Sequence, residues 1–355
     1  MGTRVSLRLS AGLLAAGCLA LAAGPAAAQS PPLQPGTGPD WALKMFNETS
    51  HDFGAVARGA EVKAKIVITN PYVEDVRILG VSESCSCTDA TTPAKTVLKT
   101  RESTEFEISM DTRRFVRHKD AVVTVRLEST QYAEVRIPVQ MYVRTDVVLT
   151  PGGANFGAID VGKGGVQKIA IAYAGAPDRQ DWQIVEARTT SPHLEVALDE
   201  VSRSGGGTSN VLVDYALTVT LKPSAPPGSF RGLIQLVTND AANPVIPVIA
   251  EGRIEADVTV TPETVDLGTL RPGNAKTVQV VIRGKKPFAI EKIECESDEE
   301  AFAVRLPEGE RAVHVLPLTV TPPEKPGDFR ELFTVTIPGR EEPVTFKARG
   351  RIAVN

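Results

Sequence analysis

The sequence predicts an all-β protein of three tandem immunoglobulin-like antiparallel β-sandwich domains, which follow a cleaved signal peptide and a Pro/Gly linker. Three observations carry this prediction. A glycine-framed heptapeptide recurs at intervals of about one hundred residues, close to the length of one such sandwich. Between its copies lie short segments in which apolar residues alternate, with no helical period. Shorter motifs also recur between the second and third units, which indicates tandem duplication.

The heptapeptide consists of a bulky apolar residue, Gly, a small residue, an aliphatic residue, two free positions and a second Gly. Its copies are Phe53–Gly59, Phe156–Gly162 and Leu267–Gly273. We expect the apolar pair to point inward. We expect each Gly to permit a turn that a Cβ would obstruct, just before a new strand begins. The copies therefore mark the same corner of three equivalent domains.

Residues 1–28 have the features of a secretory signal peptide. Arg4 and Arg8 form a basic region, and Leu9–Ala23 form an apolar region. Ala26–Ala28 provide a small-residue cleavage site. We therefore expect an exported protein that is periplasmic or on the cell surface.

A second interpretation of this segment takes Ala15-Ala16-Gly17-Cys18 as a lipoprotein processing site, with the lipid on Cys18. Residues 29–40, which follow the signal peptide, are rich in Pro and Gly. They predict a linker that would hold the first domain away from whatever anchors the N-terminus.

Charge and hydropathy exclude several classes of partner. The chain of 355 residues has a net charge of −4, and loss of two arginines with the signal peptide makes the mature chain more acidic still. A mildly acidic surface argues against general nucleic-acid binding and against a polybasic membrane-surface protein. The apolar N-terminal run is short for a bilayer span, so we expect no transmembrane span in the mature chain.

The first domain is predicted over residues 41–145. Residues 61–69 alternate cleanly and end at Asn70-Pro71, which stops the strand. Their inward face comprises Val62, Ala64, Ile66 and Ile68. Further strands are predicted at 76–81, 104–110, 121–127 and 134–143.

The second and third domains are predicted over residues 146–256 and 257–355. Both open with Val-x-x-Thr-Pro, at Val147–Pro151 and Val258–Pro262. Gly205–Gly207 predict a hairpin tip in the second domain. Because linkers between the units are almost absent, we expect the domains to stack end to end as a rod with restricted hinges. Predicted strands of the second domain are 166–173, 211–221, 231–237 and 245–250.

The first unit resembles a bacterial family catalogued as domain of unknown function 1573. The resemblance covers roughly residues 45–145 and rests on His51–Val56, the strand ending at Thr69-Asn70, and Cys85–Thr88. Ser86 stands where the family usually has Gly between its cysteines. The family is similar to the immunoglobulin-like group that includes major sperm protein and cilium- and centrosome-associated modules. The resemblance implies an exported β-sandwich protein and no established activity.

Cys85 and Cys87 are the one constellation with candidate chemistry. Thiolates two residues apart in a strand could hold a soft metal ion such as Cu(I), or act as a redox pair where the backbone bends. In straight strand geometry their Cα atoms would lie about 6.6–6.8 Å apart, near the upper limit for a disulfide. A structural reading, as buried thiols or a disulfide that pins a loop, is favoured because a closed metal site needs further ligands.

The other candidate residues give weaker signals. Cys295 leaves an odd thiol in the mature chain, and burial is its expected role. The histidines form no i, i+4 pair; they are His51, His118, His193 and His314. Residues 111–120 form the densest basic segment and Ser297–Glu300 an acidic one, and both are expected to be solvated turns. Gly205–Ser209 lack the Lys of a phosphate-binding loop.

The sequence thus predicts an exported, non-catalytic cell-envelope protein that acts as a spacer or a protein-binding module and needs no cofactor. Its expected partner is another envelope protein or a surface polymer. The alternative is a periplasmic thiol- or copper-handling protein that uses Cys85 and Cys87. An enzyme would require a cleft at a domain junction lined by converging acids and His.

Overall fold

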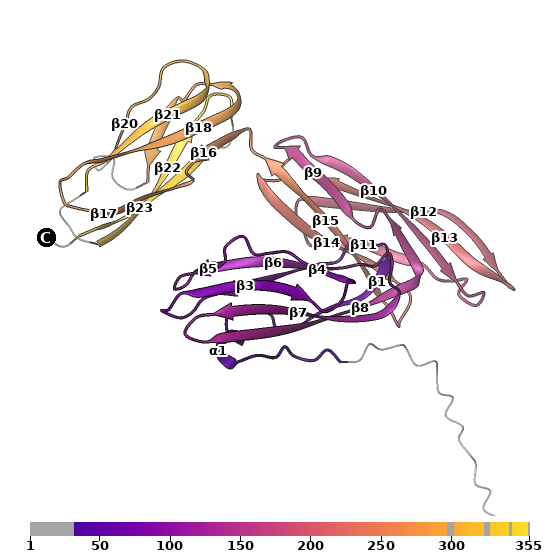
Figure 1. Cartoon of the computed structure of the whole chain (residues 1–355). Helices are drawn as coiled ribbons and strands as arrows, with labels where there is room; N and C mark the ends of the chain where they lie inside the picture. The colour runs from indigo at the N-terminus through magenta and orange to yellow at the C-terminus, as the bar shows by residue number, and fades with distance from the viewer. Residues whose placement is uncertain (1–31, 297–301, 323–326, 341–342, 354–355) are drawn as a thin grey trace, which may run out of the picture.

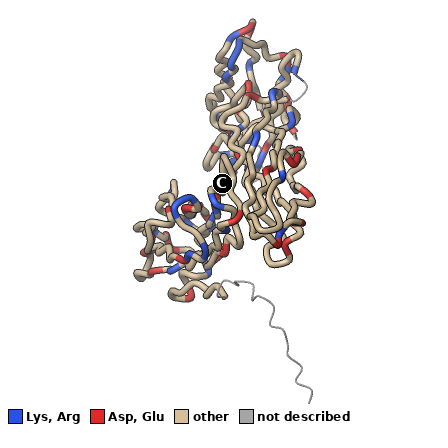
Figure 2. The backbone as a smooth tube through the Cα atoms, turned by 90° about the vertical axis from the view of Figure 1, so that its right-hand side faces the viewer, with Lys and Arg blue, Asp and Glu red and all other residues tan. Residues whose placement is uncertain are grey.

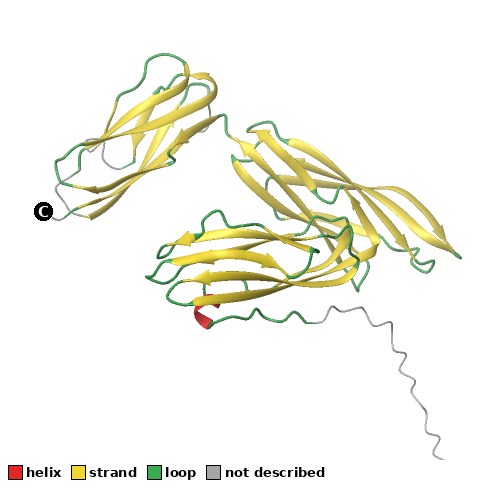
Figure 3. Cartoon of the chain, in the orientation of Figure 1, coloured by secondary structure: helices red, strands yellow, loops and turns green. Residues whose placement is uncertain are grey.

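A computed structural model describes residues 32–296, 302–322, 327–340 and 343–353. The predicted signal peptide, Cys18 and the acidic segment Ser297–Glu300 lie outside these residues. The described chain is almost entirely β-strand (Figures 1 and 3), with one short helix, α1 (Asp40–Leu43). The predicted all-β, tandem-sandwich fold is therefore confirmed.

The first sandwich packs two sheets against each other. One sheet has the order β2-β6-β4, and the other contains β5, β3, β7 and β8, with β1 paired to β8. The inward alternation predicted for residues 61–69 is confirmed in β2, because the four apolar residues named above are buried. The strands are β1 (His51–Arg58), β2 (Lys63–Thr69), β3 (Val76–Glu83), β4 (Thr88–Ala90), β5 (Val97–Leu98), β6 (Ser103–Met110), β7 (Arg117–Glu128) and β8 (Tyr132–Thr150).

Strand β8 runs without interruption from the first sandwich into the second. Its first part pairs with β7, and its last part, Val147–Thr150, pairs with β10. The position 145/146, predicted as a domain boundary, thus lies inside a strand. One eight-stranded sheet, ordered β12-β13-β10-β8-β7-β3-β5 with β1 on β8, spans both units. Their buried apolar residues also form one continuous core.

The second sandwich is completed by the four-stranded sheet β11-β14-β15-β9. A hairpin joins β12 to β13 with Gly207 at its tip, where the sequence predicts one. The strands are β9 (Ala154–Asp160), β10 (Gly165–Gly175), β11 (Ile184–Thr189), β12 (Leu194–Gly206), β13 (Ser209–Leu221), β14 (Gly228–Thr238) and β15 (Val245–Glu255).

The third sandwich consists of two four-stranded sheets, β16-β18-β21-β20 and β17-β23-β22-β19, around its own separate core. At its junction with the second sandwich, Lys285 forms ion pairs with Asp160 and Glu255. The strands are β16 (Val258–Thr261), β17 (Thr264–Leu270), β18 (Lys276–Phe288), β19 (Lys292–Cys295), β20 (Phe302–Val304), β21 (Arg311–Val320), β22 (Gly327–Thr336) and β23 (Val344–Ile352).

The first Gly of each heptapeptide lies inside a strand, not before one as the sequence suggested. Gly54, Gly157 and Gly268 have φ values of 70°, 62° and 63° and sit at register shifts where β1, β9 and β17 pair parallel with β8, β15 and β23. Each Gly N–H donates to the side chain two residues earlier, at 2.7–2.8 Å: Asp52, Asn155 and Asp266. The heptapeptide is thus a β-bulge closed by an Asx turn. The second Gly forms the turn after the strand.

The first two sandwiches lie side by side, so the predicted end-to-end rod is wrong for this pair (Figure 1). The outer face of β2 and β6 contacts that of β14 and β15, through Lys63–Glu251 at 2.5 Å and the Arg231–Glu107 pair. The reason is local. The Glu61 N–H donates to the Gly152 carbonyl at 2.9 Å, which draws the start of the second sandwich against β2.

Part of the predicted linker is docked on the first sandwich. Thr37 and Arg136 exchange two backbone hydrogen bonds, at 3.0 and 2.8 Å, which adds a short antiparallel bridge to β8. A Cβ on Gly36 would lie 2.2 Å from the Thr49 carbonyl oxygen. The close approach therefore depends on glycine, and residues 36–38 are part of the domain surface.

Two glycine substitutions should separate backbone strain from steric clash. A Cβ at Gly54 meets nothing within 4 Å, whereas one at Gly152 would lie 1.9 Å from the Gly59 carbonyl oxygen. We expect Gly54→Ala to cost about 1–2 kcal/mol from the left-handed φ alone and Gly152→Ala to cost more. Denaturant unfolding can be followed by fluorescence, because both tryptophans, Trp41 and Trp182, lie in the first two sandwiches. Equal losses would contradict this account.

Candidate functional site

The predicted cysteine pair lies in the turn between β3 and β4. Cys85 and Cys87 are joined by a disulfide, with Cα atoms 5.2 Å apart. The turn bends the backbone, so this distance is shorter than in a straight strand. Cys85 is half-buried and Cys87 fully buried, and Ser86 between them is exposed.

Both sides of the cysteine turn are held by backbone hydrogen bonds. The Asp111 N–H donates to the Cys87 carbonyl at 2.8 Å, and the Ser84 N–H donates to the Val122 carbonyl at 3.0 Å. With the sulfurs bonded to each other, neither is a thiolate able to bind a metal. Among the described residues, no three His, Cys, Asp or Glu side chains converge as a metal site. Nothing in this geometry favours the thiol or copper hypothesis.

The predicted basic segment directly adjoins the cysteine turn, and we call residues Asp111–Asp120 the basic turn. Asp111 closes it, accepting hydrogen bonds from the N–H groups of Arg113 and Arg114 at 2.8 and 3.0 Å. Hydrogen bonds from the Arg114 side chain and from these N–H groups lower the pKa of Asp111. Arg114 and Lys119 lie over the Phe115 ring, 5.8 and 5.4 Å from its centroid.

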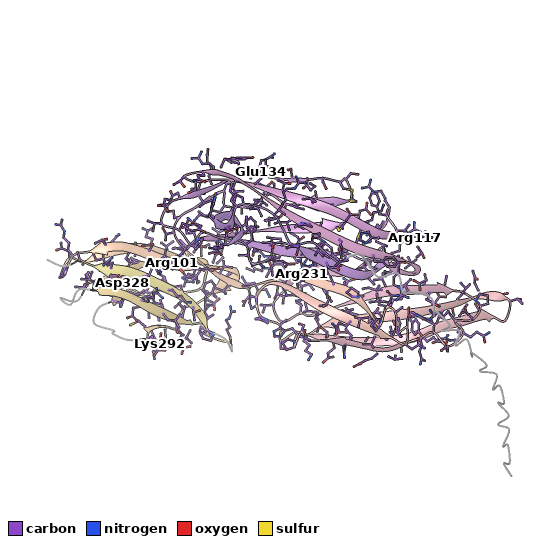
Figure 4. The ribbon with its side chains drawn as sticks, turned by 90° about the horizontal axis from the view of Figure 1, so that it is seen from below. Arg101, Arg117, Glu134, Arg231, Lys292 and Asp328 are labelled. Atoms are coloured by element: carbon purple, nitrogen blue, oxygen red, sulfur yellow. A yellow bond between two sulfur atoms is a disulfide. The ribbon has the colours of Figure 1, made fainter. Side chains whose placement is uncertain are left out.

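A groove of about 580 Å³ lies between the facing sheets of the first two sandwiches. Figure 4 shows Arg231 where these sandwiches meet. The groove carboxylates are engaged by cations: Glu105 by Lys65 at 2.8 Å, Glu107 by Arg231, and Glu251 by Lys63 and Arg231. No His lines this groove.

A buried arginine at the same junction gives no signal in the sequence. Arg144 on β8 is 2% exposed and makes a bidentate pair with Asp146, at 2.9 and 2.7 Å. It also reaches Asp240 and the Asn243 carbonyl, each at 3.4 Å. Burial works to lower the pKa of Arg144, but the carboxylates of Asp146 and Asp240 raise it overall. Arg144-Thr145-Asp146 is an ordinary polar triplet in sequence, and only the fold buries it.

The remaining predicted residues do not converge. Cys295 lies half-buried on β19 against the core of the third sandwich. His51 contacts Glu48 at 2.5 Å, and His118 lies 3.6 Å from Asp120. His314 is buried, with Nε2 2.7 Å from the Phe288 carbonyl oxygen. His193 is in the loop before β12, where its carbonyl accepts a hydrogen bond from Lys222.

The comparison with protein families agrees with the first sandwich. Residues 45–141 match the model of a family described as "Protein of unknown function (DUF1573)". The resemblance predicted from His51–Val56, the strand ending at Thr69-Asn70, and Cys85–Thr88 is therefore confirmed for that unit. No curated protein matches the chain significantly. Among the described residues, no helix is long and apolar enough to cross a bilayer.

Three of the solved structures that match the chain are distantly similar to it. The VesB protease of Vibrio cholerae is 14% identical, with a TM-score of 0.25, and the match covers 27% of this chain and 31% of the protease. A protein of unknown function from Porphyromonas gingivalis W83 is 14% identical over 62% of this chain and all of its own, with a TM-score of 0.24. The eight N-terminal Ig domains of Down Syndrome Cell Adhesion Molecule are 10% identical over 90% of this chain and 42% of their own, with a TM-score of 0.29. At such scores they support no inference about function.

We expect removal of the Arg144 guanidinium to destabilise the joined sandwiches strongly. Arg144→Met would leave the carboxylate of Asp240, which is 9% exposed, without its buried partner. Losing one partner of a buried pair costs about 3–5 kcal/mol. Arg179→Gln is the control: Arg179 is 51% exposed and 3.8 Å from Asp240, so its loss should cost about 0–1 kcal/mol. Fluorescence-monitored unfolding of both variants measures the difference. Similar losses of stability in the two variants would show that the buried Arg144 does not hold the first two sandwiches together.

The contact between the sandwiches should weaken in acid through Glu251. Burial works to raise the pKa of Glu251, but hydrogen bonds and charges from Lys63 and Arg231 lower it below its ordinary value of 4.5. A lowered carboxylate pKa stabilises the fold above the unfolded pKa, and this contribution is lost as the pH falls through the folded pKa. We therefore expect a flat contribution from pH 7 to about pH 5 and a decline below about pH 4.5.

Unfolding midpoints measured against pH test this expectation. Glu251→Gln should lower stability at pH 7 by roughly 1–3 kcal/mol and flatten the decline below about pH 4.5. Glu105→Gln is the matched control on the facing sheet, because its exposed pair with Lys65 should contribute only about 0–1 kcal/mol. An unchanged pH profile in Glu251→Gln would refute the assignment.

Proposed function

We propose that this protein is an exported, non-catalytic component of the cell envelope that acts as a spacer or protein-binding module. The observation that carries the proposal is the joining of the first two sandwiches by one strand, one sheet and one core. Such a body holds its surface loops at fixed positions, which is how rigid scaffolds present recognition loops.

The non-catalytic part of the proposal is supported by the groove between the sandwiches. Its carboxylates are engaged by Lys or Arg side chains. A general acid or base works best with a pKa near the operating pH, whereas the ion pairs of Glu251 lower the pKa of that carboxyl further from neutrality. Carboxylates fixed in ion pairs are better explained as contacts that hold the sandwiches together.

The spacer role is supported by the third sandwich. It has a separate core and joins the second through a short segment, beside which Lys285 contacts Glu255 at 2.6 Å and also pairs with Asp160. Exposed ion pairs of this kind contribute little stability. The third sandwich would therefore be the movable end of the molecule.

Crosslinking in the native envelope tests the proposal. A photoreactive residue at Ser86, exposed in the cysteine turn, is compared with one at Val166, exposed on the second sandwich (57%). We expect a discrete adduct with an envelope protein or glycan from Ser86 and little from Val166. Recovery of the protein only from the cytoplasmic fraction would disprove export. Absence of any discrete adduct at either position would leave the binding role unsupported and favour the spacer alone.

A further inference from the structure

A shallow hollow opens where the first sandwich meets the second, beside the basic turn. It measures about 330 Å³ and is lined by Arg58, Gly59, Arg113 and residues 148–152. The Arg58 Nε donates to the Arg113 carbonyl at 3.4 Å, so the Arg58 guanidinium lies against the Arg113 backbone. Both residues are exposed and line the hollow. Although the chain is acidic overall, this lining contains no carboxylate. An anion in this hollow would therefore contact Arg58 and Arg113 without a carboxylate of the lining competing for them.

The positive surface continues along the basic turn. Arg117 is exposed, and Lys119 lies over Phe115 with its ammonium near the ring. Of the nearby acids, Asp111 is engaged by Arg114 at 2.5 Å, and Asp120 lies 3.6 Å from His118. Figure 4 shows Arg117 at the end of the first sandwich beside the second. We call Arg58, Arg113, Arg117 and Lys119 together the basic surface.

The shape of this region suits an extended ligand. A second hollow of about 490 Å³ shares Gly59 and Arg113 with the first and continues along the turn to Arg114. Its lining also holds two carboxylates, each beside a cation: Glu61 lies 3.9 Å from Lys63, and Asp111 lies 2.5 Å from Arg114. Figure 2 faces this end of the molecule and shows blue segments gathered on the sandwich at the lower left. Several cations in a row can contact several anionic groups of one polymeric ligand. Because these contacts are linked through the ligand, they strengthen binding together even when each contact is weak.

The surface lacks the features of a protein–protein anchor. Protein interfaces depend on a few desolvated aromatic or apolar residues at their centre. Here Phe115 is half-buried beneath two cations, and Val116 is the exposed large apolar side chain of the turn, at 37%. A ligand would therefore be held mainly by charge and by hydrogen bonds from the exposed guanidinium groups.

From these observations we infer that the basic surface binds an acidic polysaccharide. This inference rests on the proposed function, because only an exported protein would meet a polysaccharide of the envelope. It extends that function by naming the binding site and the class of ligand. Guanidinium groups suit carboxylates because their donors match both oxygens. The cysteine turn supports the site from behind, through the hydrogen bond between Asp111 and Cys87.

Binding of purified mature chain to polygalacturonate, with neutral dextran as the uncharged probe, tests the inference. We expect binding to polygalacturonate alone, weakened steeply by added salt because exposed charges are screened. Replacing all four residues of the basic surface with Gln should weaken binding by about tenfold or more. The double variant Arg113→Gln/Arg117→Gln keeps the Arg58 side chain and its contact with the Arg113 backbone, and should give an intermediate loss.

A matched control carries four Gln substitutions at exposed arginines of the third sandwich, which change the net charge equally: Arg271, Arg283, Arg305 and Arg311. This control should bind like the wild type. Equal weakening of both quadruple variants, or none in the basic-surface variant, would overturn the site. Equally tight binding of poly-glutamate or single-stranded DNA would overturn the polysaccharide assignment. The polysaccharide assay uses purified protein, so a negative result in it would not affect the crosslinking test of the proposed function. Likewise, a negative crosslinking result in the envelope would not affect the polysaccharide assay.

Discussion

The hydrogen-bonded continuity of β8 determines how the first two sandwiches are arranged. A strand that belongs to both sandwiches within one sheet cannot swivel without breaking backbone hydrogen bonds on both sides. Here β7 and β1 hold the first part of β8, and β10 holds the last part. Arg144 lies between these two parts of β8 and forms ion pairs with Asp146 and Asp240. Folding of the two sandwiches is therefore coupled, whereas the third has a core of its own.

Each sandwich begins with the same local structure, a β-bulge closed by an Asx turn. An Asx residue bonds the N–H of a Gly in the left-handed region, and the bulge realigns the strand so that it can run parallel to the last strand of its domain. The parallel pairing gives β8, β15 or β23 a further hydrogen-bonded neighbour and ties the start of each sandwich to its end.

The single core shared by the first two sandwiches bears on the proposed role. The cysteine turn and the basic turn are tied together by a backbone hydrogen bond and lie on a body with one core. A ligand that binds there would meet a preorganised surface, which reduces the entropy lost on binding. The third sandwich has a core of its own and contacts the second through exposed ion pairs of Lys285 with Asp160 and Glu255, and such pairs contribute little stability.

The sequence alone determined the fold class and the positions of the repeated heptapeptide, because strand alternation and glycine spacing are local properties, but it did not show that the first Gly of each copy forms a bulge inside a strand. It also singled out Cys85, Cys87 and the basic turn. Only the tertiary structure decided that β8 crosses the predicted boundary, that the first two sandwiches lie side by side, and that Arg144 is buried. These features depend on contacts between residues about one hundred positions apart, such as Arg144 with Asp240. No periodicity along the chain encodes such pairs, since they arise when separate sheets meet.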